Sequence, residues 1–359
     1  MCTLSPIQLE DLASQLESKR ILKALISAHR HLAELKGISK TIPNEAILLS
    51  TLTLQEAQDS SEIENIITTQ DALYKYQLQT NTSDLAVKEV SNYAKGLSAG
   101  YEYVKKHGLL TINAIQDIHA EIEQNRAGFR KVPGTVLKNE QTGEIIYEPP
   151  SPEHIQALMG NLEQLINSDD QSVDPLVKMA LIHHQFESIH PFYDGNGRTG
   201  RIINILYLAK EELLSGPTLY LSRYINHTKS DYYRLLQDVR VNGQWEDWVV
   251  YMIRGVAITA RHAIVLIDAI KALLQTHKQH IRANHKFYSQ DLMNSIFKHP
   301  YTKVLFLERD LKVSRATATR YLDALAKDGI LEKQKMGREN YYLNIELVKL
   351  LFNTPRIES

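Results

Sequence analysis

Several features of secreted, membrane-bound or strongly charged proteins are missing from this sequence. It has a single cysteine, Cys2, which rules out an internal disulfide and favours a reducing compartment. No apolar run approaches the roughly 20 residues that a membrane-spanning helix needs. The N-terminus has neither the basic start nor the apolar core of a secretory signal. The sequence therefore predicts a soluble, cytoplasmic protein with no membrane partner.

Neither sign of charge dominates. The 41 Lys and Arg nearly balance the 42 Asp and Glu, which gives a formal net charge of -1. This balance excludes a globally basic nucleic-acid-binding protein and a polyacidic chain, although a local basic patch is compatible with it. The 359 residues are enough for two or three domains, each with its own core.

Strand-like stretches are few, and most of the chain has the three- and four-residue apolar spacing of amphipathic helices. We therefore expect a mainly α-helical protein. The predicted helices cover residues 5–36, 44–59, 84–107, 111–125, 153–167, 175–188, 199–214, 231–241 and 245–272.

A different pattern occupies residues 132–148. Two short apolar runs, 135–137 and 145–147, are separated by polar residues and Gly143. This pattern predicts a small β-hairpin. We expect it to end at Pro149 and Pro150, because proline cannot donate a ladder hydrogen bond.

The character changes again after about residue 280. Residues 301–311, 315–328 and 330–343 predict a helix, a second helix and a two-stranded wing. Ser314 is expected to cap the second helix and Gly329 to follow its last turn. The order resembles a winged helix, an α+β domain.

Positive charge is enriched in this C-terminal part, where residues 285–345 hold eleven Lys and Arg against seven Asp and Glu. A helix-turn-helix presents the start of its second helix to the major groove, and a wing contacts phosphates. DNA is therefore a candidate partner of residues 280–359, and protein docking or dimerisation is the alternative. The residues expected to face DNA are Arg315, Thr317, Thr319, Arg320, Lys333, Lys335 and Arg338.

The segment 190–201, His-Pro-Phe-Tyr-Asp-Gly-Asn-Gly-Arg-Thr-Gly-Arg, has the groups needed to hold a polyphosphate. Gly195 and Gly197 stand at the start of a helical run, where free backbone amides form an anion-binding concavity. Arg198 and Arg201 are three apart and so lie on one side of that helix. Two guanidiniums beside the amides favour a polyphosphate over a single anion.

Two further side chains in this segment supply chemistry. Asp194 offers a hard oxygen ligand, which suits Mg²⁺ that bridges phosphates. His190 has an unperturbed pKa of about 6.5 and can act as a general base near neutral pH. A base, a metal ligand and a phosphate cradle therefore fall within twelve residues.

At every defined position the segment resembles the Fic-domain signature His-x-Phe-x-Asp/Glu-Gly-Asn-Gly-Arg-x-x-Arg. The resemblance extends over residues 45–260 or so. It implies a protein adenylyltransferase in which His190 deprotonates a Tyr, Thr or Ser hydroxyl that attacks the α-phosphate of ATP. It also implies a helical region over 1–100, a Fic catalytic core over 101–275 and the winged helix over 280–359.

The resemblance assigns the remaining site residues. Asp194 would hold Mg²⁺, and Phe192 would anchor the loop in the core. Nucleotide contacts are implied for Gly195, Asn196, Gly197, Arg198 and Arg201, for Tyr233 and Arg240 near the adenine and ribose, and for Val136 and Leu137 of the hairpin.

The hairpin at 132–148 matches the flap of the family, whose exposed strand edge pairs with an extended target segment. Backbone pairing positions the acceptor hydroxyl with little sequence selectivity, so the sequence does not identify the target protein. Self-modification and a homodimer are both compatible with the sequence.

An inhibitory pattern of the family, Ser/Thr-x-x-x-Glu-Gly/Asn, is matched by Ser60, Glu64 and Asn65. The resemblance implies that Glu64 pairs with Arg201 and prevents it from orienting the γ-phosphate. We therefore expect an enzyme that is restrained by its own chain.

Three alternatives remain open from sequence. The same fold could use another donor, for UMP or phosphocholine transfer, or could remove AMP. A third alternative is a DNA-binding regulator with a nucleotide-sensing core, which the intact His190 argues against. His183 and His184, next to each other on a helix, point about 100° apart and so are not expected to share a metal ion.

Overall fold

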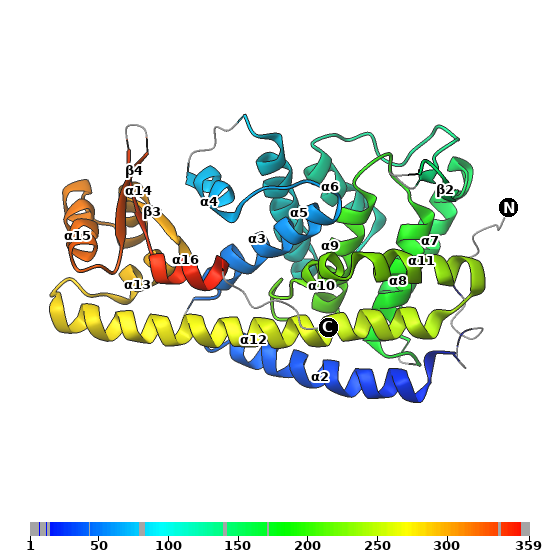
Figure 1. The fold of residues 1–359 in the computed structure, drawn as a ribbon, viewed down its shortest axis with the longest axis horizontal. Helices are drawn as coiled ribbons and strands as arrows, with labels where there is room; N and C mark the ends of the chain where they lie inside the picture. The colour runs from blue at the N-terminus through cyan, green and yellow to red at the C-terminus, as the bar shows by residue number, and fades with distance from the viewer. Residues whose placement is uncertain are drawn as a thin grey trace.

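The computed structural model describes residues 7, 12, 15–42, 44–78, 83–138, 142–170, 172–336 and 339–352. Across these residues the protein is mainly helical, with two small antiparallel sheets (Figure 1). The helices are α2 (Lys19–Ser39), α3 (Glu45–Ile63), α4 (Gln70–Leu78), α5 (Leu85–His107), α6 (Ile112–Glu123), α7 (Pro152–Asn167), α8 (Pro175–Ile189), α9 (Asn196–Lys210), α10 (Leu221–His227), α11 (Lys229–Asn242), α12 (Trp245–Asn284), α13 (Gln290–Lys298), α14 (Val304–Leu311), α15 (Arg315–Lys327) and α16 (Ile345–Phe352). The strands are β1 (Leu137–Lys138), β2 (Ile145–Tyr147), β3 (Tyr301–Lys303), β4 (Glu332–Met336) and β5 (Glu339–Leu343).

The longest element is α12, which runs the length of the molecule with α2 packed along it (Figure 1). Its 40 residues correspond to about 60 Å at 1.5 Å per residue. Helix α2 buries one apolar stripe against it, formed by Ile21, Leu25, Ala28, Leu32 and Leu35. This spacing of three and four residues is the reason that α2 lies flat on α12 rather than standing away from it.

Helices α8 and α9 form the centre of the core. Every residue of α8 after its first proline is buried, and α9 is buried from Arg198 to Leu208. A helix that is buried on all sides must be surrounded by other helices. The loop at 190–195 joins these two helices, so it has little freedom to move.

The C-terminal region lies at one end of α12, and the β1–β2 hairpin lies at the other end of the molecule (Figure 1). Strands β3, β5 and β4 form a sheet in that order, all antiparallel. Ser314 caps α15 by accepting from the Thr317 amide, and Gly329 after the helix has φ +77°, as the sequence predicts. Gly337 and Arg338, between β4 and β5, lie outside the described residues, and so does the expected DNA contact of Arg338.

This region packs against the N-terminal helices α3 and α4. Gln55 Nε2 of α3 donates to the Leu351 carbonyl at 2.8 Å, and the Tyr301 hydroxyl donates to Asp71 of α4 at 2.7 Å. The ring of Tyr74 stacks on Tyr301, with centroids 5.5 Å apart. The C-terminal region is therefore in direct contact with α3, the helix that ends next to Glu64.

Several predicted boundaries are wrong. The expected helix over 5–36 is interrupted at residues 17–18, where Ser18 caps α2. The helix expected from 199 begins at Asn196, and the helix expected to stop at 272 continues to Asn284. Residues 301–303, expected to be helical, form β3 because they pair with β5. In the hairpin, β1 is Leu137–Lys138 rather than 135–137.

Four short helices were not predicted: α4, α10, α13 and α16. Each has seven to nine residues. Helices this short have little intrinsic stability and form because their apolar face is packed. Among the described residues, no helix combines the length and the apolar character that crossing a bilayer requires.

Candidate active site

The loop from His190 to Gly195 is held by its own side chains. His190 ends α8 in a left-handed conformation, φ 48°, and its amide still donates to the Phe186 carbonyl at 3.0 Å. The buried Asn196 side chain donates to and accepts from the backbone of Phe192, at 2.9 and 2.8 Å. Phe192 is fully buried, as predicted. The Asn196 side chain therefore shapes the loop rather than pointing into the site.

Helix α6 supports the loop from the other side. The His119 ring stacks on Phe192 with centroids 3.7 Å apart, and its Nε2 lies 3.0 Å from the Asp194 carbonyl. Asp194 is exposed, and its Oδ1 accepts from the Gly195 amide at 2.7 Å. The predicted metal ligand is thus presented toward solvent by a rigid support.

Two glycines stand at the start of α9, where acidic side chains come close to the backbone. Gly195 has φ +69°, which favours glycine, and a Cβ at this position would collide with the carboxylate of Glu123. A Cβ at Gly197 would collide with the carboxylate of Glu64. The first-turn amides of α9 therefore face a space that two acids already approach.

The two signature arginines meet a single carboxylate. Glu64 Oε1 accepts from Arg201 Nη2 at 2.7 Å, and Glu64 Oε2 accepts from Arg198 Nε at 3.1 Å. Arg201 is buried and also donates to the Ser60 hydroxyl and carbonyl, at 2.7 and 2.9 Å. Burial opposes the charge of Arg201, but the charges of Glu64, Tyr232, Tyr93 and Glu187 together outweigh it and raise the arginine pKa. The contact between Glu64 and Arg201 expected from the sequence is present.

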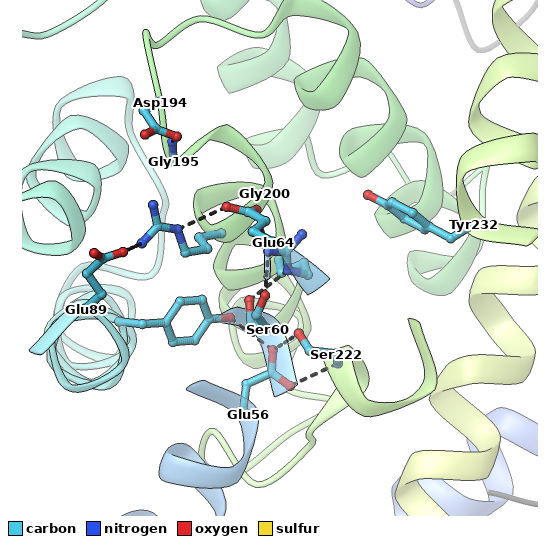
Figure 2. Close-up of polar contacts among 12 residues, drawn as sticks. Glu56, Ser60, Glu64, Glu89, Asp194, Gly195, Gly200, Ser222 and Tyr232 are labelled. Carbon is cyan, nitrogen blue, oxygen red and sulfur yellow. Dashed lines mark hydrogen bonds and ion pairs between the residues drawn. The ribbon is translucent and has the colours of Figure 1, made fainter. Parts of the chain in front are cut away.

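Helix α3 and the residue that follows it carry a regular row of polar side chains. Glu56, Ser60 and Glu64 are spaced by four residues and so lie on one side of the helix (Figure 2). Glu56 Oε1 accepts from the Tyr93 hydroxyl at 3.0 Å, and Oε2 accepts from the Ser222 amide at 3.0 Å. Burial raises the pKa of Glu56 to about 7. These bonds fix the rotation of α3 and so direct Glu64 onto the arginines.

Two acids that the sequence did not single out complete the surroundings of Arg198. Glu123 Oε1 of α6 accepts from Arg198 Nη2 at 2.8 Å, and Glu89 Oε2 of α5 accepts from Nη1 at 3.4 Å. Both lie far from the signature in sequence, and neither belongs to a recognisable motif. Only the packing of α5 and α6 against α9 brings them to the site.

The environment of His190 keeps its ring neutral. Burial, reinforced by the positive charges of Arg240 and Arg130, lowers the pKa of His190 to about 4. A neutral imidazole is the form that can accept a proton. The neighbouring Glu187 is buried, and burial raises its pKa to about 7.

Arg130 is a further residue that sequence reasoning missed. It is buried, and its Nε donates to the His190 carbonyl at 2.8 Å while Nη2 donates to the Pro150 carbonyl. Its own amide donates to the Pro191 carbonyl at 2.9 Å. Through its side chain and its own amide, Arg130 thus joins the backbone of His190, the following proline and the end of the hairpin. Tyr193, given no role from sequence, accepts from the Lys131 amide beside it at 2.8 Å.

The hairpin is tied to α11. The Arg240 guanidinium lies over the Tyr147 ring and donates to Ser188 Oγ at 3.0 Å, and Gln237 Nε2 donates to the Ile146 carbonyl at 3.0 Å. Arg240 therefore reaches the hairpin and the end of α8. Val136 and Leu137 are half-buried on the hairpin, and Tyr233 is half-exposed with its ring against Tyr232.

The histidines next to the site have structural partners. His183 Nε2 lies 2.8 Å from the Tyr232 hydroxyl, and His184 Nε2 lies 3.2 Å from the Leu236 carbonyl. Across the described part of the chain, no cluster of three or more His, Cys, Asp or Glu side chains could hold a metal ion. Mg²⁺ is commonly bound through one or two carboxylates together with substrate phosphates. The single exposed carboxylate of Asp194 fits that mode of binding.

Three family models match the chain. Residues 22–102 match the model described as Fic/DOC family N-terminal, and residues 109–208 match the model of the Fic/DOC family. These two matches together cover half of the chain. Residues 273–347 match the C-terminal domain of "Protein adenylyltransferase SoFic-like".

Individual proteins are similar over parts of the chain. A protein adenylyltransferase Fic from Aedes aegypti is 26% identical over 153 residues, which is 41% of this chain and 30% of that protein. One from Drosophila ananassae is 32% identical over 95 residues, which is 26% of this chain and 18% of that protein. The chain therefore matches less than a third of the length of these relatives.

The fold itself is shared over almost the whole chain. The crystal structure of a Fic family protein from Desulfovibrio desulfuricans G20 matches with a TM-score of 0.58 and 20% identity. The match covers 95% of this chain and 98% of that one. At this identity the likeness concerns the fold alone.

Proposed function

Because this chain belongs to the Fic/DOC family, we propose that it is a protein adenylyltransferase that moves AMP from ATP to a Tyr, Thr or Ser hydroxyl. One observation carries the proposal. His190, held neutral by burial, stands at the end of α8, six residues before the helix start where the amides and Arg198 and Arg201 converge. A base therefore adjoins a polyphosphate cradle.

The chemistry follows from these positions. The His190 ring takes the proton of the target hydroxyl, whose oxygen attacks the α-phosphate as the bond to the β-phosphate breaks. Pyrophosphate leaves with the electrons of that bond. The amides of Gly195, Asn196 and Gly197 and the two arginines hold the phosphates that depart. Mg²⁺ held at Asp194 would neutralise phosphate charge.

Glu64 restrains this reaction in our proposal. Its carboxylate lies between Arg198 and Arg201, at 3.1 and 2.7 Å, and crowds Gly197. The γ-phosphate would have to take the place of this carboxylate, so ATP would bind with its α-phosphate poorly directed at His190.

The acceptor protein would dock on the β1–β2 hairpin. Ile145 and Ile146 of β2 and Val132 before β1 are all exposed large apolar residues. An extended segment added to a strand edge gains affinity from backbone hydrogen bonds and from such side chains. Arg130 and Tyr147 connect this hairpin to the backbone next to His190.

Mass spectrometry of the full chain after incubation with Mg-ATP tests the proposal. We expect a gain of one AMP on the chain itself or on an added protein, and none with His190→Ala. Incubation with Mg-UTP or CDP-choline in parallel tests the donor. Equal labelling by the His190→Ala chain, or labelling only by another donor, would refute AMP transfer by His190.

A second candidate function is regulation through DNA, because Arg315 and Arg320 are exposed at the start of α15. Lys333, however, is engaged by Asp323 at 2.7 Å. A gel-shift series of the full chain against duplex DNA at 50 and 200 mM salt tests this. Binding that is lost with Arg315→Ala and Arg320→Ala and weakens steeply with salt would support it. Unchanged binding in both variants would exclude this surface.

A further inference from the structure

Arg198 is held by three carboxylates, and the inhibitory pattern accounts for only one of them. The contacts of Glu123, Glu64 and Glu89 with its guanidinium are 2.8, 3.1 and 3.4 Å long. The exposed fractions of the three acid side chains are 14%, 25% and 42% in the same order. Glu123 is therefore the most buried and the closest of the three. Ion pairs become stronger as the distance between the charges falls and as solvent is excluded. Of the three contacts, the one with Glu123 is therefore expected to be the strongest.

The position of Glu123 is set by the scaffold. It is the last residue of α6, and His119 lies one turn earlier on the same face. His119 is fixed to the loop by its stacking on Phe192 at 3.7 Å and its contact with the Asp194 carbonyl at 3.0 Å. The carboxylate of Glu123 is thus carried to Arg198 by a helix that is itself joined to the active loop.

The same carboxylate stands over the phosphate cradle. A Cβ at Gly195 would collide with Glu123 Oε1, so this oxygen is in contact with the first residue of the cradle. A carboxylate of this chain therefore lies beside the residue that caps α9, whose first-turn amides form the cradle in our proposal. The guanidiniums of Arg198 and Arg201 are thus surrounded by three carboxylates of the chain. A triphosphate that enters the site adds further negative charge.

We propose that Glu123 sets the affinity of this site for nucleoside triphosphates by occupying the place of a phosphate on Arg198 and above Gly195. This rests on the proposed function of the same site. Glu123 and Glu64 have separable effects because Glu123 contacts Arg198 but not Arg201 in the hydrogen bonds and ion pairs of the site. Glu64 bears on the direction of the γ-phosphate, and Glu123 on how tightly the polyphosphate is held.

The test uses Glu123→Gln in the full chain, because glutamine keeps the shape against Gly195 and removes the charge. Glu89→Gln is the matched control, since it removes a charge from the same guanidinium at a longer and more exposed contact. Binding of ATP and of AMP is measured by calorimetry in a His190→Ala background, where transfer does not consume the nucleotide. AMP is informative because it lacks the two phosphates that Arg198 would hold.

We expect the Kd of ATP to fall about tenfold with Glu123→Gln, which corresponds to about 1.4 kcal/mol. Glu89→Gln should change it less than about twofold, and the Kd of AMP should stay the same in both variants. Glu123→Asp keeps the negative charge but holds it farther from Arg198, because the side chain is shorter. The Kd of ATP for this variant should lie between those of the original chain and Glu123→Gln. Circular dichroism melting of each variant checks that it folds, and the Asp variant remains as a test if the Gln variant does not.

Three outcomes would overturn the proposal. The first is an unchanged ATP Kd in a folded Glu123→Gln chain. The second is an equal gain for AMP, which would mean that the cradle is merely less negative overall. The third is weaker ATP binding with Mg²⁺ but not with EDTA, which would make Glu123 a metal ligand. If the Glu64→Gly chain transfers no AMP while Glu123→Gln still tightens ATP binding, the proposed reaction fails and the role of Glu123 stands.

Discussion

The guanidinium carbon of Arg240 lies 4.0 Å from the centre of the Tyr147 ring, although the two residues are 93 positions apart in the sequence. This contact fastens β2 to α11. The Tyr147 hydroxyl also donates to the Ser188 carbonyl at 2.9 Å, two residues before His190. The hairpin expected to receive the target is therefore joined, through one aromatic side chain, to the backbone two residues before His190.

Replacing Tyr147 should loosen the hairpin in two steps. Tyr147→Phe removes the hydroxyl bond, which contributes about 0.5–1.5 kcal/mol, and should speed hairpin opening by about 2- to 10-fold. Tyr147→Leu also removes the contact with Arg240, worth about another 0.5–1 kcal/mol. Hydrogen exchange of residues 132–148 by mass spectrometry measures both. Exchange as slow in the Leu variant as in the original chain would show that Tyr147 does not hold the hairpin.

Glu64→Gly should raise AMP transfer by about tenfold or more, since each 1.4 kcal/mol of released restraint corresponds to a factor of ten. Radiolabelled ATP with the purified chain measures the rate. Glu62→Gly is the control, because it places glycine at an exposed position in the same turn of α3 without touching either arginine. Equal or lower transfer by the Glu64 variant would remove the inhibitory role.

Arg130→Met should destabilise the protein by about 3 kcal/mol, because it leaves the buried carbonyls of His190 and Pro150 without their charged donor. Urea unfolding followed by circular dichroism gives the difference. Arg126→Ala is the control: its side chain is 83% exposed and pairs with Asp117 at the surface, where an ion pair contributes about 0–1 kcal/mol. If Arg130→Met lowers the free energy of unfolding as little as the control does, the loop at 190–195 does not depend on Arg130 for its stability.

The rate of AMP transfer should change little with pH in mildly acidic solution. Burial, with Arg240 and Arg130, lowers the His190 pKa to about 4, so its ring stays neutral from pH 8 down to pH 5 and becomes protonated near pH 4. A histidine with an ordinary pKa of about 6.5 would be only ~3% neutral at pH 5 and would lose about 30-fold in rate. Initial rates of the Glu64→Gly chain between pH 5 and 8 distinguish the two. A rate that falls with a midpoint near pH 6.5 would show that His190 titrates normally and would contradict this prediction.

A depressed histidine pKa also has a consequence for stability. The unfolded chain binds a proton at each histidine near pH 6.5, whereas burial lowers the folded pKa of His183 and His184 to about 3. Stability from these groups is therefore present above pH 6.5 and is lost as the pH falls toward 3. Glu56 and Glu187, with folded pKa values of about 7, oppose this trend because their contribution is lost as the pH rises from about 4.5 to 7.

The active loop could be predicted because its groups are local. His190, Asp194, the glycines and the arginines lie within twelve residues, and helix geometry alone places Arg198 and Arg201 on one side. The structure confirms the predicted contact between Glu64 and Arg201 and adds a contact between Glu64 and Arg198 that was not predicted. That this acid is Glu64 followed from a resemblance and not from geometry, since 137 residues separate Glu64 from Arg201.

Other elements could not be predicted because their stability comes from distant partners. Residues 301–303 have no helical or strand signal strong enough to decide between them, and they become β3 only by pairing with β5, about 40 residues later. Helices α4 and α16 are short, and Tyr74 of α4 is packed between Tyr301 and Phe352 of the C-terminal region. The apolar spacing of a local segment does not reveal contacts with residues so far away in the sequence.

The sequence by itself determined the mainly helical architecture, the hairpin, the C-terminal pair of helices with its two-stranded wing, and the chemistry available at 190–201. Each of these depends on residue type and on spacing within one or two helical turns. The tertiary structure alone decided which charges surround that chemistry. Glu89, Glu123 and Arg130 come from α5, α6 and the loop after it, and only their packing against α9 and the end of α8 makes them neighbours of the site. The physical reason is that an electrostatic environment depends on distances through space, which the order of residues along the chain does not contain.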